Sequence, residues 1–446
     1  MESVLLYVLG ILVVVVGLAL SIGLHEVGHL LPAKLFGVKV GQYMIGFGPT
    51  LWSRKFGETE YGLKAIPMGG YISMAGMYPP AKDGTVSARA SSTGFFQTLV
   101  QDARTASAET VLVGQEERVF YKLSVWKRIV IMLGGPTMNL IIGIVLYAVL
   151  LMGFGAQQVS TTIGSVSECV VSQTTSSTSD AACAADDPKA PGAAAGLLPG
   201  DRFVSLDGTK ITSWNQATDI IRDSAGDDLT MVVERDGENV TLTSVPLLTE
   251  RYVYDADGKV VVDSDGESVT EKVGFLGIGA AYETVQQPVA AVLPAVGDNI
   301  GRVGEMIFNL PARLVDVVNA AFGPDERDPN GPISVVGVGR LAGEISSIDT
   351  IPVVDKVSSL IGLLASLNIA LFVFNLVPLM PLDGGHVAGA LWEGIRRFFA
   401  KLFGRKDPGP VDIAKLVPLT LVVVVLLGSM SALLIYADLV KPISIL

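Results

Sequence analysis

The stretch VLLYVLGILVVVVGLALSIGLHEVGHLLPAKLF, residues 4–36, decides the fold. Its apolar run exceeds the roughly 20 residues that a helix needs to cross a bilayer. A secretory signal peptide is the competing interpretation. The run is too long for one, its start carries no Lys or Arg, and no small-residue cleavage site follows it. We therefore expect residues 1–36 to form a retained transmembrane helix.

The composition is that of a membrane protein. Hydrophobic residues make up 50% of the 446-residue chain and charged residues only 17%, which is too apolar for an ordinary soluble protein. Three further segments are long and apolar enough to span a bilayer, and we expect transmembrane helices at 125–155, 356–390 and 414–438. The net charge is −12 and no Lys- or Arg-rich stripe occurs, so we expect no nucleic-acid partner.

Basic residues indicate how the helices are oriented. Lys and Arg gather between the first and second apolar segments and between the third and fourth. The positive-inside rule therefore makes 77–124 and 391–413 cytoplasmic loops. The long segment between the second and third helices is rich in Asp and Glu. We expect that segment and both termini to be extracytoplasmic, in a multi-pass protein of the cell membrane.

Short β-like runs separated by Gly, Pro and charged turns fill residues 37–76 and predict a hairpin. An open sheet edge cannot face lipid. We therefore expect this membrane-associated β-hairpin to lie at the membrane interface or to line a protein cavity. In the loop that follows, FFQTLVQDA at 95–103 predicts a short amphipathic helix.

Residues 160–285 predict an extracytoplasmic α+β domain, in the order strand, Gly-rich turn, strand, helix and two alternating strands. The turn contains Gly196 and Leu197. Its glycines serve turn chemistry, and an edge-strand groove in this domain could capture an extended peptide or a free C-terminus. Cys169 and Cys183 bracket a polar run. They either pair as a disulfide in an oxidising compartment or remain two small apolar residues.

We expect residues 286–355 to form an amphipathic linker between the α+β domain and the third transmembrane helix. Apolar residues recur with helical spacing in 298–322, and Pro311 is the expected break. The following GPISVVGVGRLAG, residues 331–343, is Gly-rich. We expect it to be irregular and to lie at the mouth of the helix bundle.

HEVGH, residues 25–29, carries the chemistry. His25 and His29 stand at i and i+4, on one helix face, so they can bind one metal ion. Glu26 projects from a neighbouring position and suits the activation of a water molecule. The alternative is a pair of helix histidines satisfied by their neighbours. The chain has only three histidines, and an intramembrane Glu is costly unless it is functional or paired, so we favour a metal site.

A catalytic zinc usually takes three protein ligands and keeps one position open. NLVPLMPLDGGH, residues 375–386, offers candidates at the cytoplasmic end of the third transmembrane segment. Asp383 and His386 are both possible ligands, and residue chemistry alone does not decide between them. Asp383 also suits a helix start, and Asn375 a hydrogen bond between helices. Four residues are expected to break the helix: Pro378, Pro381, Gly384 and Gly385.

These motifs resemble those of the site-2 protease family, whose members are intramembrane zinc metalloproteases. The resemblance rests on HEVGH in a first transmembrane helix combined with N-x-x-P-x-x-P-L-D-G near the end of a later one. Further similar stretches are GFGP at 46–49, PMGGY at 67–71, WKRIVIMLGGPTMN at 126–139 and GPIS at 331–334. Residues 190–245 resemble the PDZ domain of bacterial members. A single PDZ-like unit resembles the actinobacterial arrangement.

The resemblance implies a role for each matching residue. The implied ligands of Zn²⁺ are His25, His29 and Asp383. Glu26 would activate the water, Asn375 would stabilise an oxyanion or hold the substrate backbone, and His386 would be a local residue. Substrate-binding residues are expected at Asn139, Gly69, Gly70, Tyr71, Gly196 and Leu197.

We therefore expect an intramembrane zinc metalloprotease that cleaves transmembrane segments of single-pass proteins within the lipid bilayer. By resemblance, the substrates would be anti-sigma factors or signal-peptide remnants. The alternative is a membrane scaffold or receptor whose PDZ-like domain binds partners and whose metal site is structural or vestigial. Glu26 argues against this alternative, because a structural zinc does not need an unligated carboxylate.

Overall fold

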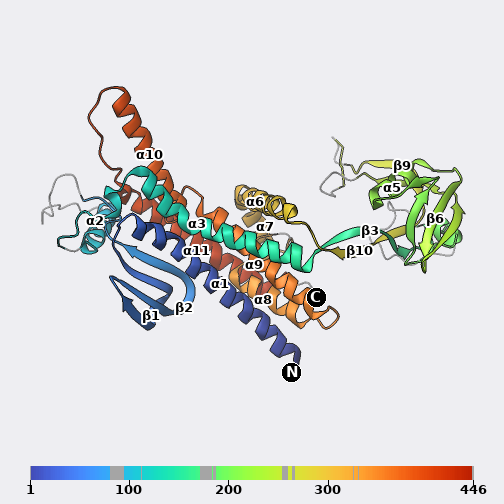
Figure 1. The fold of residues 1–446 in the computed structure, drawn as a ribbon, viewed down its shortest axis with the longest axis horizontal. Coiled ribbons are helices and arrows are strands. Elements are labelled where there is room, and N and C mark those ends of the chain that lie inside the picture. The colour runs from blue at the N-terminus through green and yellow to red at the C-terminus, as the bar shows by residue number, and fades with distance from the viewer. Residues whose placement is uncertain are drawn as a thin grey trace. The chain divides into compact units, whose positions relative to one another are not determined.

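The chain forms two compact units, each of which is described by itself. Unit 1 comprises Met1–Phe154 and Gln287–Leu446, and unit 2 comprises Gly155–Gln286. The computed structural model describes residues 2–80, 95–111, 113–170, 183, 187–253, 260–263, 267–324, 326–329 and 331–443. Figure 1 shows the elements of both units along the chain.

Within the described residues, unit 1 contains four helical segments that are long and apolar enough to cross a membrane. They are Ser3–Leu35, Val125–Phe154, Val353–Asn375 and Ile413–Val440. The corresponding elements are α1 (Glu2–Leu35), α3 (Val125–Ala148) with the π-helical η2 (Val149–Phe154), α9 (Val353–Asn375), and η4 (Ile413–Leu416) with α11 (Val417–Val440). The number of candidate spans is the number expected from the sequence.

Two glycines bring α1 and α3 into backbone contact. A Cβ placed on Gly28 would lie 2.2 Å from the carbonyl oxygen of Gly134, and one on Gly134 would lie 2.0 Å from the carbonyl oxygen of Gly28. Small residues allow such close approach between membrane helices. The contact therefore fixes the histidine-bearing turn of α1 against the middle of α3.

The segment after α1 is a curled antiparallel hairpin of β1 (Val40–Phe56) and β2 (Thr59–Met74). Its central stretch pairs twice with β2, since Met44 lies opposite both Gly62 and Tyr71. The hairpin lies beside the later turns of α1 (Figure 1). The hydroxyl of Tyr43 donates a 2.7 Å hydrogen bond to the carbonyl oxygen of Gly23, two residues before His25.

The expected helix after the hairpin is present as α2 (Phe95–Glu109), and η1 (Phe120–Lys122) leads into α3. Arg104 of α2 forms an ion pair with Asp412, just before η4. Part of the loop expected at 77–124, residues 81–94, lies outside the described residues.

After unit 2, the chain returns through η3 (Val289–Ala291), α6 (Val292–Phe308) and α7 (Leu310–Phe322). The break between α6 and α7 falls at Asn309, two residues before Pro311, as Pro favours the first turn of a helix. Residues 335–347 form α8 (Val335–Ser347), which corrects the expectation of irregular structure there.

Residues 335–347 are helical despite their glycines because a capping residue and close packing stabilise α8. The hydroxyl of Ser334 accepts hydrogen bonds from the backbone N–H groups of Val336 and Gly337. A Cβ on Gly337 would lie 2.4 Å from the carboxylate of Asp438, and one on Gly343 would lie 2.6 Å from the ring of Tyr7. These glycines therefore admit neighbouring side chains instead of ending the helix.

The third span is not continuous through 390. After α9, residues 376–382 are not helical, and α10 (Asp383–Leu402) begins at Asp383. The expected break is therefore confirmed at Pro378 and Pro381. Gly384 and Gly385 instead belong to the first turn of α10, where a Cβ would meet the backbone of the preceding loop. Much of the loop expected at 391–413 is the rest of α10.

Unit 2 is an α+β unit with one main antiparallel sheet in the order β10–β3–β4–β6–β7, with β5 beside β4. Its strands are β3 (Ala156–Val166), β4 (Arg202–Leu206), β5 (Thr209–Lys210), β6 (Leu229–Arg235), β7 (Glu238–Ser244) and β10 (Ile278–Val285). A separate hairpin consists of β8 (Leu247–Tyr252) and β9 (Thr270–Phe275), and the helices are α4 (Pro191–Ala194) and α5 (Trp214–Asp223).

The two cysteines of unit 2 form a disulfide, with their Cα atoms 5.9 Å apart. This resolves the alternative that the sequence left open. Residues 171–182, most of the expected loop between them, lie outside the described residues.

Candidate metal centre

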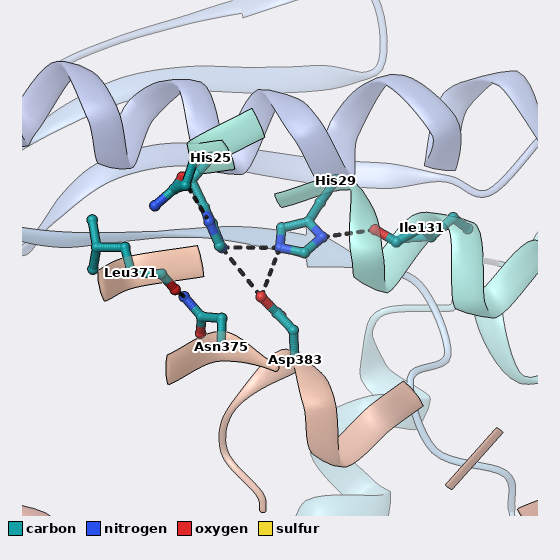
Figure 2. A network of polar contacts seen from close by, with 7 residues as sticks. His25, His29, Ile131, Leu371, Asn375 and Asp383 are labelled. Carbon is teal, nitrogen blue, oxygen red and sulfur yellow. Dashed lines mark hydrogen bonds and ion pairs between the residues drawn. The ribbon is translucent and has the colours of Figure 1, made fainter. Parts of the chain in front are cut away.

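Three potential metal ligands from two distant parts of the chain meet inside unit 1. Nε2 of His25 lies 3.2 Å from Nε2 of His29. Oδ2 of Asp383 lies 3.2 Å from Nε2 of His25 and 3.3 Å from Nε2 of His29. Figure 2 shows this triangle between α1 and the start of α10.

A second set of contacts orients both imidazoles. Nδ1 of His29 lies 2.7 Å from the carbonyl oxygen of Ile131, and Nδ1 of His25 lies 3.2 Å from Oδ1 of Asn139. Both acceptors belong to α3. A carbonyl oxygen can only accept, so Nδ1 carries the proton in each ring and Nε2 presents a lone pair.

The arrangement fits a bound cation. Two imidazole lone pairs and a carboxylate oxygen converge, and such a set of acceptors needs a positive charge at its centre. Oδ2 of Asp383 is buried and has no hydrogen-bond donor in the described part of the chain. Two nitrogens and one oxygen are a typical protein ligand set of a catalytic zinc site.

Gly135 makes room for this cluster. A Cβ on Gly135 would lie 2.2 Å from Nε2 of His29 and 2.6 Å from Nε2 of His25. Any larger residue would therefore occupy the space toward which the two ligand nitrogens point. The geometry of the triangle therefore depends on α3 as well as on α1 and α10.

Three of the expected substrate-binding residues lie on β2 of the hairpin, and Gly70 among them lies beside α1. A Cβ on Gly70 would lie 3.0 Å from Cγ of Glu26, so the backbone of β2 passes directly beside that side chain. Gly69 has a φ of 106°, which favours glycine. The hydroxyl of Tyr71 donates to Oε1 of Gln42 across the sheet.

Comparisons with known proteins agree with a metal site at this position. A family model described as peptidase family M50 matches residues 13–406, a range that includes all three potential ligands. The chain belongs to peptidase family M50. It is therefore a zinc metalloprotease of the site-2 protease type. Members of this family are membrane proteases that act on membrane-bound substrates.

Individual M50 relatives are similar over most of the chain. Zinc metalloprotease Rip1 of Mycobacterium tuberculosis is 34% identical, with 98% of this chain and 99% of the relative covered. Zinc metalloprotease Rip1 of Mycolicibacterium smegmatis is 31% identical, covering 99% of this chain and 100% of the relative. Metalloprotease MmpA of Caulobacter vibrioides is 28% identical over 85% of each chain.

Asn375 and Asn139 of this M50 protease lie around the triangle in different ways. Asn375 ends α9, and its amide group donates a 3.0 Å hydrogen bond to the carbonyl oxygen of Leu371 (Figure 2). Asn139 is buried, 1% exposed, and contacts His25. It is thus in contact with a potential ligand rather than open to a substrate. His386 lies one turn after Asp383 and outside the triangle.

Gly196 and Leu197 lie in a tight turn of unit 2. Leu197 is 2% exposed and belongs to the core of that unit. The carbonyl oxygen of Gly196 accepts a 2.8 Å hydrogen bond from Arg235. A separate cavity of about 220 Å³ lies between α5, β8, β9 and residues 276–278. Neither Gly196 nor Leu197 lines it.

The sequence analysis did not identify the groups that support the potential metal ligands. They are the carbonyl of Ile131 and the glycines Gly28, Gly134 and Gly135. The two adjacent glycines inside an apolar helix were a usable signal, because glycine there often marks a close helix–helix approach. The carbonyl of Ile131 carries no side-chain signal at all.

Proposed function

We propose that His25, His29 and Asp383 hold the catalytic zinc of this protease and that Glu26 is its general base. The observation that carries the proposal is the convergence of three ligand atoms, each about 3.2–3.3 Å from the other two. Zinc bound by this set would polarise the scissile carbonyl and lower the pKa of a coordinated water.

The roles of the chain's own residues follow from their positions. Glu26 follows His25 directly and takes up the proton of the attacking water, then returns it to the leaving amine. Asn139 and Ile131 keep Nδ1 of each imidazole protonated, so that Nε2 faces the metal. Asn375 still has one amide N–H beyond its bond to Leu371 and donates it to the oxyanion or the substrate backbone.

The hairpin presents the substrate as an added strand. Residues 70–73 of β2 pair with β1 on one side, and the Gly70 backbone passes beside Glu26. An extended peptide paired with the other side of this stretch would bring its backbone to the base. A transmembrane helix hides its backbone in its own hydrogen bonds, so local unwinding of the substrate must precede cleavage.

In the proposed topology, the metal centre lies near the cytoplasmic side, and unit 2 and both termini are extracytoplasmic. The basic residues of the two shorter connections support this orientation. The substrates are single-pass membrane proteins such as anti-sigma factors or signal-peptide remnants, after their outer domains have been shortened. The family resemblance supports this class.

Unit 2 is a PDZ-like domain whose recognition groove is the cavity between α5 and residues 276–278. β10 is an edge strand of the main sheet, so a peptide can extend that sheet. Trp214, Ile221 and Phe275 give the cavity apolar walls, and Arg222 and Arg251 stand beside it. This set suits an extended peptide with an apolar end and a carboxylate.

The ligand set is tested by zinc content in the purified full-length protein. Asp383→Ala should lose zinc while His386→Ala retains it, because only Asp383 faces the two imidazoles. Loss of zinc in the His386 variant alone would overturn the assignment of the third ligand. Retention of zinc in both would leave the triangle without a metal role.

The substrate class is tested by trapping in cells. Glu26→Gln should still bind substrate without cleaving it, so single-pass membrane proteins with shortened outer domains should accumulate on the variant. The matched control is the same variant with Asp383→Ala. If only soluble proteins or polytopic membrane proteins accumulate, the proposed substrate class is wrong. The scaffold alternative predicts no difference in substrate processing between the wild type and Glu26→Gln.

A further inference from the structure

A second cluster of buried charges lies on the helices that form the metal centre, away from the centre itself. Glu393 of α10 is 0% exposed and forms an ion pair with Arg128 of α3, whose side chain is 3% exposed. The same carboxylate lies 3.0 Å from a guanidinium nitrogen of Arg397. It also accepts a 2.9 Å hydrogen bond from the backbone N–H of Val411.

Stability alone does not account for this arrangement. Two charges lose their hydration when they are buried, and apolar residues of similar volume often hold a core together as well. What an ion pair adds is a defined register, because its hydrogen bonds form at one relative position of the two helices. Glu393 thus ties α10 to α3 and to the segment that leads into η4 and α11.

The two tied helices contribute different parts of the metal centre. Arg128 stands one turn before Ile131, whose carbonyl oxygen orients His29, and α3 also supplies Asn139. Glu393 stands on the helix that begins with Asp383, ten residues and about 15 Å further along. A helix transmits an axial shift or a rotation along its length, so a shift at Glu393 also displaces Asp383.

Asp383 is not joined to α9 by a continuous helix. Residues 376–382, which connect α9 to α10, are not helical. Gly384 and Gly385 lie against the backbone of this loop, and the rest of α10 is positioned by its packing on α3 and η4. Gly389 lies against Ile413, Gly394 lies against Val125, and Val387 packs with the cluster that contains Ile131.

We propose that Arg128 and Glu393 are a positioning pair that sets the register of α10 on α3 and so delivers Asp383 to His25 and His29. The inference rests on the proposed role of Asp383 as a zinc ligand. The pair touches neither metal nor substrate. It acts only through the place that it gives to Asp383.

The test is a double-mutant cycle on zinc affinity in the purified full-length protein, measured by competition with a chelator. Glu393→Gln should weaken zinc binding about tenfold, the lower end of the effect of removing a residue that supports a ligand. In an Asp383→Ala background, the same change should have no further effect. The visible spectrum of Co²⁺-loaded Glu393→Gln should shift toward the spectrum of Co²⁺-loaded Asp383→Ala.

Asp438→Asn is the matched control. Asp438 and Arg327 form another ion pair in unit 1, with side chains 3% and 4% exposed, but they lie on elements that carry none of the three ligands. That variant should lower thermal stability and leave zinc affinity unchanged. If Glu393→Gln does not fold, Arg128→Lys takes its place in the cycle, with a weaker effect in the same direction.

The outcomes separate this proposal from the assignment of the ligand. If Asp383→Ala itself leaves zinc affinity unchanged, the ligand assignment fails and the positioning role fails with it. If Asp383→Ala weakens zinc binding but the Glu393 and Arg128 variants do not, only the positioning role is wrong. Glu393→Gln could also lower zinc affinity by the same factor in the wild-type and Asp383→Ala backgrounds. That result would overturn the positioning role, because the effect would not depend on Asp383.

Discussion

Oδ2 of Asp383 lies 3.2 Å from Nε2 of His25, although the two residues stand near opposite ends of the chain. No local sequence preference can bring them together. The contact exists because α1 and α10 both pack on α3, which also orients each imidazole. Changes in α3 should therefore impair metal binding even where they remove no ligand.

Gly135→Ala is the sharpest change of this kind. Its added Cβ would lie 2.2 Å from Nε2 of His29, so the ligands must move apart. We expect zinc affinity to fall about 100-fold, and overpacking to lower the free energy of unfolding by about 1–3 kcal/mol. Chelator competition and thermal unfolding of the purified protein measure the two effects.

Gly362→Ala in α9 is the control for Gly135→Ala. A Cβ at Gly362 would make only an ordinary contact, 3.6 Å from the side chain of Leu150. Zinc affinity should be unchanged in this variant. Unaltered zinc binding in Gly135→Ala would contradict the geometry around the two imidazoles.

Asn139→Leu should weaken zinc binding about tenfold, because Nδ1 of His25 loses its acceptor and the ring loses its fixed tautomer. Asn368→Leu is the matched control. Asn368 is an equally buried asparagine whose amide bonds Ser21 and Leu364, not a ligand. If both variants retain full zinc affinity, Asn139 does not orient His25. If both lose it equally, the effect is a general one of removing a buried amide.

The acid stability of unit 2 should depend on Asp201. Hydrogen bonds from the guanidinium of Arg235, and a further one from the backbone N–H of Leu198, hold the pKa of the Asp201 carboxyl below its ordinary value. A carboxyl whose pKa is lower in the folded state stabilises the fold above its unfolded pKa of about 3.9. That contribution is lost as the pH falls from there through the folded pKa.

Asp201→Asn should remove this dependence. We expect lower stability at neutral pH, because the buried side chain at position 201 no longer offers a charged acceptor to Arg235, which is itself 27% exposed. The difference between the variant and the wild type should shrink below about pH 4. Trp214 fluorescence, in a chain with Trp52, Trp126 and Trp392 changed to Phe, reports unfolding of unit 2. A difference that is constant from pH 7 to pH 2 would rule out the proposed titration.

The sequence predicts those features that depend on local pattern. Apolar length locates the four spans, and the i, i+4 spacing of HEVGH locates two potential ligands on one helix face. The prolines at 378 and 381 mark the break after α9. Each of these features is set within one or two helical turns, where periodicity and backbone chemistry dominate.

The features that sequence could not predict depend on contacts between distant segments. The glycines of α8 suggest irregular structure until Asp438 and Tyr7 are seen to fill the space beside them. The choice between Asp383 and His386 depends on how α10 packs on α3, and from the residues alone it stayed open. The cavity of unit 2 is lined from α5 and from β9, some fifty residues apart, and not from the Gly-rich turn.

The central claim is that Glu26 acts on a water at a zinc held by His25, His29 and Asp383. The most direct test compares Glu26→Gln with the wild type, both purified at full length, for zinc content and for cleavage of a single-pass membrane substrate. We predict unchanged zinc content and a fall in the cleavage rate of about 1,000-fold, within the range that a general base contributes. Cleavage at the wild-type rate with zinc still bound would contradict the claim.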